Sequence, residues 1–296
     1  MRPIKLLNIK TDYVFKRIFG REGNEQITKN FLSCILGEKV SDIELEKNPI
    51  LEKDLMDDKV GILDIKAEIN KNTKVDIEMQ IIDKKNSAKR ILFYCAKLFI
   101  RSLKSGKDYN SLKKTISILI ADYELDELKE VRKYITKWNI REEDCSKIIL
   151  TDAMEIYIIE IEKFKKYQGT ERYKELDSWI KFIENPEVVD MSNKEIVMAK
   201  KVLDEISQDE HERYLAEMRE KYILDQNATE AAGYDKGLKE GHKKGIEEGI
   251  KQGHEKGVEE GKKEIAKKML EEKLDLGLIE KVTNISKEEL KKMQEK

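Results

Sequence analysis

The sequence predicts an α/β fold, in which a mixed β-sheet is flanked by helices and followed by an α-helical C-terminal extension. Three observations lead to this prediction. Two short amphipathic helical patterns precede an alternating hairpin, a basic helix then leads into a dense apolar run, and from residue 171 onward the periodicity is helical. Helices interleaved with strands in this order are typical of an α/β core with mixed strand directions.

The first two helices are expected over residues 11–20 and 24–37, where apolar residues recur at helical spacing and a glycine ends each pattern. A short strand is expected near residues 43–46. Two core strands are expected over residues 115–123 and 154–164, because both stretches are rich in isoleucine and other strand-forming residues.

The stretch GILDIKAEINKNTKVDIEMQ, residues 61–80, predicts two alternating strands joined by a polar turn at residues 70–73. From Leu63 to Ile69 and from Lys74 to Gln80, apolar side chains occupy the odd positions and charged or polar ones the even positions. Facing residues of a hairpin point to the same side, so only registers that pair odd with odd keep both apolar sets together.

Two registers meet this condition. One places Glu68 opposite Asp76, so that two acidic residues face each other. The other places Glu68 opposite Lys74 and Lys66 opposite Asp76, which forms two cross-strand ion pairs. We therefore predict the second register.

The predicted register leaves one repulsive pair, Asp64 opposite Glu78. Carboxylates about 5 Å apart repel by about 1 to 3 kcal/mol at effective dielectric constants of 80 to 20. Either both side chains are solvated, or a divalent cation lies between them. Mg²⁺ suits the second interpretation because it takes oxygen ligands and often uses just one or two carboxylates. From spacing alone both interpretations stay open.

The composition predicts a cytoplasmic protein without a membrane segment, because we find neither an apolar leader nor a run long enough to span a bilayer. The three cysteines are isolated, which excludes a disulfide framework and a cysteine zinc site. All three histidines lie in the last third of the chain. Chemistry near the hairpin is therefore expected to use carboxylates, lysines and metal-bound water.

Basic residues gather in the first part of the chain, although the net charge is only −2. Residues 1–122 carry 24 Lys and Arg against 18 Asp and Glu, whereas residues 123–296 carry 34 against 42. Between Lys84 and Lys114 there are ten basic residues and one acid. This bias favours contact with a polyanion.

A helix expected over residues 87–104 carries much of this positive charge. At 100° per residue its apolar side chains separate from a basic face with Tyr94 at its edge, and that face is formed by Arg90, Lys97, Arg101 and Lys104. A solvated surface is the usual explanation of such a face. Because no acids compensate these charges and the acidic hairpin precedes them, phosphate binding is an equally good explanation of this face.

The tail repeats glycine at every fourth position, eight times, from Gly233 to Gly261. In an isolated helix these glycines would cost about 6 to 8 kcal/mol relative to alanine. A self-associating helix would offset this cost, since glycine permits close approach of backbones. A flexible charged spacer is the other interpretation. A short helical segment is expected to follow over residues 262–296.

Taken in order, several short motifs of the chain resemble those of the Rpn family, the recombination-promoting nucleases, which are also described as transposases of the PD-(D/E)XK nuclease superfamily. The resemblance covers roughly residues 5–165 and the glycine repeat. Its motifs are TDYVFKRIFG at residues 11–20, LDI at 63–65, IEMQ at 77–80, Arg90 with Tyr94, GKDY at 106–109, and the apolar strand that follows.

The resemblance implies a PD-(D/E)XK nuclease-like core and a DNA endonuclease that depends on Mg²⁺ or another divalent cation. Asp64 and Glu78 match the metal-binding acids of the motif. Gln80 occupies the usual lysine position, where it can hydrogen-bond water or phosphate but carries no charge. Lys59 and Lys66 are the candidates to replace that charge.

Two further residues, Asp12 and Lys16, match the family's N-terminal motif and would lie beside the site. A helix-capping role explains Asp12 equally well.

The predicted organisation is a nuclease domain over residues 1–165, a helical region over 166–232, the glycine repeat over 233–262 and a helical tail over 263–296. The predicted function is metal-dependent hydrolysis of DNA phosphodiesters, in recombination or a transposase-like role, by a homodimer joined through the C-terminal helical region. The alternative is a catalytically inactive, transposon-derived module that binds DNA or protein, and Gln80 is the residue that supports it.

Overall fold

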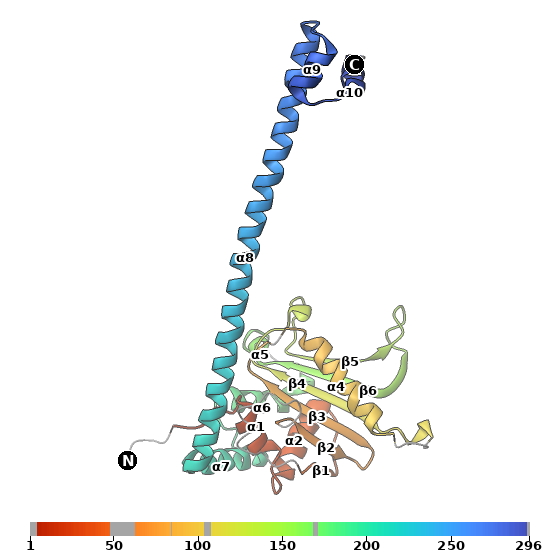
Figure 1. Ribbon diagram of the computed structural model, residues 1–296. Helices are drawn as coiled ribbons and strands as arrows, with labels where there is room; N and C mark the ends of the chain where they lie inside the picture. Colours follow the sequence, from red (N-terminus) through yellow and green to blue (C-terminus); the bar gives the residue numbers. More distant parts are fainter. Residues whose placement is uncertain (1–4, 48–62, 84, 104–107, 168–170, 295–296) are drawn as a thin grey trace. The chain divides into compact units, whose positions relative to one another are not determined.

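The structure is a computed structural model that describes residues 5–47, 63–83, 85–103, 108–167 and 171–294 (Figure 1). Contacts divide the chain into two compact units, Met1–Gln226 and Asn227–Lys296. The domain boundaries expected from the sequence remain predictions. No helix in the described ranges is long and apolar enough to cross a membrane.

A six-stranded mixed sheet forms the centre of the first unit, as predicted, in the order β1-β2-β3-β4-β6-β5. β2 pairs antiparallel with β1 and β3, and β5 pairs antiparallel with β6, whereas β3, β4 and β6 run parallel. The strands are β1 (Ile43–Leu45), β2 (Ile65–Ile69), β3 (Thr73–Gln80), β4 (Lys114–Ala121), β5 (Ile135–Arg141) and β6 (Ile149–Glu160).

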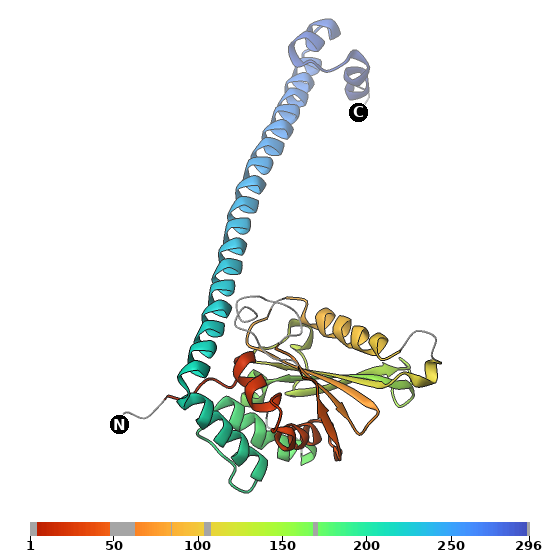
Figure 2. The ribbon, with the colours of Figure 1, turned by 60° about the horizontal axis from the view of Figure 1, so that its bottom comes forward.

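Helices cover both faces of this sheet (Figures 1 and 2). α4 (Ser87–Arg101) joins β3 to β4 and packs on one face, where Ile91 meets Leu119 and Ile158. The other face packs against α1 (Asp12–Phe19), α2 (Glu25–Leu36), α6 (Lys174–Glu184) and α7 (Lys194–Gln208). Odd residues of β2 and β3 point to this larger core, because side chains alternate along a strand.

The first unit also contains shorter elements. They are α5 (Ile161–Lys166) and the 3₁₀ turns η1 (Tyr109–Ser111), η2 (Asp126–Leu128) and η3 (Glu171–Tyr173).

The larger core contains an aromatic cluster that joins α1, α2 and α6. The Phe19 ring lies 4.8 Å from that of Phe31 and 5.5 Å from that of Trp179, centroid to centroid. Trp179 also donates from Nε1 to Asn30 Oδ1 at 2.8 Å. The cluster holds the end of α1 close to β2, so close that a Cβ at Gly20 would lie 3.1 Å from Ile65 Cγ1.

α8 (Glu210–Glu271) begins in the first unit, and charged contacts attach its first turns to α1. Arg219, only 5% exposed, donates from Nη2 to Asp12 Oδ2 at 2.7 Å. Glu212 accepts from the Tyr13 hydroxyl at 2.7 Å and pairs with Arg17. The N-cap of α1 is Thr11, so Asp12 lies inside the helix rather than at its cap position.

The elements β6, β5 and α4 differ from those expected. β6 ends at Glu160, not at residue 164, because the Glu160 carboxylate turns inward to pair with Lys163 at 2.9 Å and to accept the Leu125 N–H at 2.8 Å. β5 was not expected, since most of its side chains are at least partly exposed and only its pairing with β6 defines it. α4 ends at Arg101, before Lys104, and its apolar residue Leu92 is 55% exposed.

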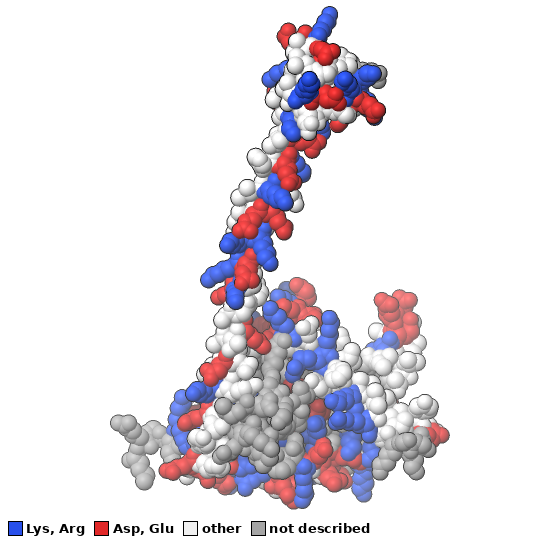
Figure 3. All heavy atoms as spheres, viewed as in Figure 1, with Lys and Arg blue, Asp and Glu red and all other residues white. Residues whose placement is uncertain are grey.

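The second unit contains the rest of α8, α9 (Leu276–Thr283) and α10 (Lys287–Gln294). The glycine repeat lies within the continuous α8 helix, and its side chains are exposed, with acids and bases interspersed along it (Figure 3). Ala266, Leu270, Ile279, Ile285 and Leu290 form a small core between the end of α8, α9 and α10. Asp275 accepts the Leu278 N–H to begin α9, and Asn284 ends it with φ of 60°.

Candidate active site

The hairpin has the predicted register. Lys66 pairs with Asp76 and Glu68 with Lys74, whose Nζ lies 2.7 Å from the Glu68 carboxylate. β2 begins one residue after Asp64, and continuing the register places Asp64 opposite Glu78. The charges along the hairpin therefore complement each other except at the end where Asp64 and Glu78 lie.

The structure brings charged groups from three elements to Asp64. Burial raises the pKa of its carboxyl well above the usual value, and the charges of Asp76 and Glu78 raise it further. Lys66 and Lys16 oppose this effect. Of the auxiliary residues predicted from the sequence, Lys16 and Lys66 thus act directly on Asp64, whereas Lys59 lies outside the described residues.

Asp76 is the residue that the sequence interpretation missed at this site, because it was assigned only as the partner of Lys66. It is 9% exposed, and its Oδ1 is buried without a hydrogen-bond partner. Burial, together with the charges of Glu78 and Glu46 and against that of Lys66, raises the pKa of Asp76 to about 7. Its position two residues before Glu78, on the same strand face, was the available signal.

This excess of negative charge fits a divalent cation. An unpartnered buried carboxylate oxygen is costly, and a cation beside Asp64 and Glu78 would compensate it. Among the described residues, no three His, Cys, Asp or Glu side chains are placed to hold a metal together. A divalent cation such as Mg²⁺, which commonly takes one or two carboxylates and keeps several waters, would be held here by Asp64 and Glu78.

Glu78 is contacted by an amide and a guanidinium. Gln80 donates from Nε2 to Glu78 Oε1 at 2.5 Å, and Arg90 Nη2 lies 3.7 Å from the same oxygen. The Arg90 Nε atom is buried without a hydrogen-bond partner, and its guanidinium lies over the Tyr94 ring at 5.8 Å. Arg90, predicted to contact DNA, is thus placed beside the acidic pair.

The other predicted DNA-binding residues extend along α4. Lys97 is exposed, with Nζ 5.9 Å from the centre of the Phe93 ring. Arg101 lines a cavity of about 380 Å³ together with Glu46, Lys66 and Lys74. Lys104 lies outside the described residues. Figure 3 shows Lys and Arg side chains gathered over α4.

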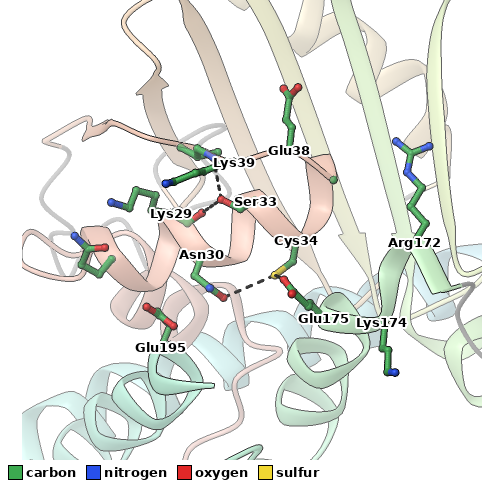
Figure 4. A pocket seen from close by; sticks show the side chains of 13 residues that line it. Lys29, Asn30, Ser33, Cys34, Glu38, Lys39, Arg172, Lys174, Glu175 and Glu195 are labelled. Carbon is green, nitrogen blue, oxygen red and sulfur yellow. Dashed lines mark hydrogen bonds between the residues drawn. The ribbon is translucent and has the colours of Figure 1, made fainter. Parts of the chain in front are cut away.

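A separate pocket of about 680 Å³ lies by α2 and α6 (Figure 4). Lys29, Lys39 and Arg172 line it together with acids such as Glu175. Burial raises the pKa of the Cys34 thiol to about 12, so this cysteine is not an activated nucleophile. The pocket therefore offers no activated thiol.

The mixed sheet, its helices and the acidic pair on adjacent strands define a nuclease-like fold. A family described as PD-(D/E)XK nuclease family transposase matches residues 9–232, and the chain belongs to this family. Residues 259–295 match the C-terminal HTH domain of the Rpn/YhgA-like nuclease family, in agreement with the Rpn resemblance. A search of curated proteins and a search of solved structures found no match. The sequence interpretation expected only a helical tail where the HTH domain lies.

The Asp76 carboxyl should make the stability of the metal-free protein depend on pH. Its pKa is about 7 in the folded protein against an ordinary value of 3.8, so the stability it contributes is complete below pH 3.8 and is lost as pH rises through 7. From pH 5 to pH 8 this loss should be about 2 to 4 kcal/mol. Urea unfolding in EDTA should show a smaller loss for Asp76→Asn than for wild type.

Asp126→Asn is the matched control, because that side chain is 77% exposed. It should keep the wild-type pH dependence. If the unfolding free energies of wild type and Asp76→Asn changed equally with pH, this would contradict the assigned burial of the Asp76 carboxyl.

Proposed function

We propose that this protein is a divalent-metal-dependent DNA endonuclease that hydrolyses phosphodiester bonds. The observation that carries the proposal is the cluster of Asp64, Asp76 and Glu78, whose charges act on one another in a buried setting. Membership of the PD-(D/E)XK nuclease family supports it. A role in recombination or in a transposase-like reaction is proposed on the same membership.

In this proposal Asp64 and Glu78 hold Mg²⁺ or a similar cation, with Asp76 beside them. When bound, the cation lowers the pKa of a water and neutralises phosphate charge. Gln80 directs its amide hydrogens toward the carboxylate end of the site and can orient a water or a phosphate oxygen. Lys16 and Lys66, the cations that act on Asp64, supply the positive charge that a lysine at position 80 would carry.

Arg90 has two roles in this mechanism, one toward Glu78 and one toward the DNA. Its guanidinium balances Glu78 in the structure, and its planar donors suit a phosphate of the bound strand. A cation on Glu78 would take over that balance and leave Arg90 donors for the DNA. Arg90 thus links metal binding to substrate binding.

Removing either metal-binding acid should abolish cleavage. Asp64→Ala and Glu78→Ala are each expected to slow Mg²⁺-dependent nicking of supercoiled DNA by at least about 100-fold, because the cation contributes several kcal/mol of transition-state stabilisation. Glu44→Ala, which removes an exposed acid on the neighbouring strand, should cleave like wild type.

Unchanged cleavage by Asp64→Ala in a clean preparation would refute the assignment. If the wild type binds DNA but cleaves neither DNA nor RNA with any divalent metal, the protein is the catalytically inactive binding module instead.

We further propose that α4 holds the DNA backbone through Arg90, Lys97 and Arg101, together with Lys104. Such contacts position the duplex without reading its sequence. The HTH match at residues 259–295 supports a second contact with DNA.

Salt dependence tests the contribution of α4. Each phosphate contact releases counterions, so the Lys97→Ala, Arg101→Ala double variant should reduce the slope of log affinity against log salt concentration by about 1.8. Titrations of labelled duplex DNA at several salt concentrations measure the slope. Lys129→Ala removes an exposed lysine outside α4 and should preserve it. A wild-type slope in the double variant would exclude α4 as the DNA-binding helix.

We also propose that the glycine repeat joins two copies of the chain into a homodimer. Beyond the helix's own backbone, a Cβ at any of the eight glycines would meet no atom within 4 Å, so the repeat exposes backbone along a line that winds by about 40° per glycine around α8. Exposed apolar residues follow the glycines, among them Leu238, Ile246 and Ile250. A second copy would cover this apolar and backbone surface.

If the glycine repeat forms the dimer interface, replacing its glycines should stabilise the helix but weaken the dimer. Gly241→Leu with Gly249→Leu should raise helical propensity, by roughly 1 kcal/mol per site, yet shift sedimentation from dimer to monomer. Lys243→Leu with Lys251→Leu changes the opposite side of the helix and should leave the dimer intact. A monomeric wild type, or a dimer that tolerates both leucines, would contradict the proposal.

A further inference from the structure

Tyr123, two residues after β4, reaches the side chain that replaces the usual lysine. β3 and β4 run parallel with Gln80 beside Ala121, and the Asp122 N–H donates to the Gln80 carbonyl at 2.9 Å. This extension of the ladder brings the Tyr123 hydroxyl to 2.6 Å from Gln80 Oε1. The Tyr123 hydroxyl also lies 2.9 Å from Ser87 Oγ at the start of α4.

The donors and acceptors in this chain of contacts permit one direction. The Glu78 carboxylate only accepts, so Gln80 presents its NH₂ to Glu78 and its carbonyl oxygen to Tyr123. The single hydroxyl hydrogen of Tyr123 is then used on Gln80. The Ser87 hydroxyl has one hydrogen, for which the Tyr123 oxygen at 2.9 Å and Asp83 Oδ1 at 3.2 Å compete, so the direction fixed by the acceptors is Tyr123 to Gln80 to Glu78.

We propose that Tyr123 is a positioning residue that fixes the orientation of the Gln80 amide, and that it does so only because position 80 is a glutamine. This inference rests on the proposed nuclease function. A lysine at position 80 would have three donors and no acceptor, so it could not accept the hydrogen of Tyr123. The tyrosine and the glutamine thus act as a pair.

The need for Tyr123 arises when Glu78 is engaged elsewhere. Gln80 is 9% exposed, so few waters can replace a lost partner of its amide. A cation held by Glu78 would compete with the amide for the same carboxylate. The Tyr123 contact would then be the one that prevents the amide from rotating and presenting its oxygen to the phosphate.

The Tyr123 hydroxyl is suited to this role because it retains its hydrogen. Burial, with the charges of Asp83 and Glu78 and against the hydrogen bond to Ser87, raises the pKa of Tyr123 to about 12. The hydroxyl is therefore a donor at any pH at which the enzyme would be assayed.

A double-mutant cycle tests the pairing. Tyr123→Phe should lower kcat for nicking of supercoiled DNA about tenfold, with KM changed less than about twofold, since one buried hydrogen bond is lost without loss of DNA contacts. In the Gln80→Lys background the same tyrosine change should alter kcat less than about twofold. Tyr214→Phe, whose side chain is 53% exposed, is the matched control and should behave as wild type.

A second measurement does not depend on cleavage. In protein labelled with ¹⁵N-glutamine and measured with Mg²⁺ but without DNA, the Gln80 side-chain amide is assigned by its loss in Gln80→Glu. Its hydrogen exchange should become at least about fivefold faster in Tyr123→Phe and stay unchanged in Tyr214→Phe.

Unchanged amide exchange in Tyr123→Phe would overturn the proposal. An equal loss of kcat in the wild-type and Gln80→Lys backgrounds would overturn it too, since that pattern denotes a merely structural tyrosine. If the wild type does not cleave DNA, the nuclease function fails, whereas faster amide exchange would still support the positioning role of Tyr123.

Discussion

The pairing of β2 with β3 is the constraint on which the rest of the structure depends. It places odd residues of both strands in the larger core and even residues on the face toward α4, so a slip by one residue would bury the charged set. The same pairing neutralises Glu68 with Lys74 but gathers three acids, Asp64, Asp76 and Glu78, which the cations of Lys16, Lys66 and Arg90 balance only in part. Core formation and the electrostatic imbalance of the site therefore have a single origin.

Helix α1 connects this imbalance to the rest of the first unit. Lys16 acts on Asp64, while Asp12 and Tyr13 are held by Arg219 and Glu212 from the first turns of α8. The close approach at Gly20 leaves α1 little room to shift against β2. The position of the buried Lys16 thus depends on contacts with a helix that continues into the second unit.

In the proposed nuclease, the glutamine at position 80 would leave two roles that one lysine could combine, positive charge and directed hydrogen bonding, to different residues. Positive charge near Asp64 comes from Lys16 and Lys66, on α1 and β2. Directed hydrogen bonding comes from the amide, whose two ends bind different partners. Such a site would depend on more residues than one with a lysine, because an amide needs a neighbouring group to determine which way its oxygen and its NH₂ point.

Local periodicity and cross-strand charge allowed several features to be predicted from the sequence. These are the hairpin register, the order of most helices and strands, and the placement of Asp64 opposite Glu78. The edge strand β5, the burial of Asp76 and the partner of Asp12 could not be predicted. Tyr123 lies 43 positions from Gln80, and Arg219 lies 207 positions from Asp12. The sequence by itself determined which residues alternate and where charge is unbalanced. Only the tertiary structure decided which distant side chains surround that charge, because desolvation and long-range contacts exist only after the sheet and helices have packed.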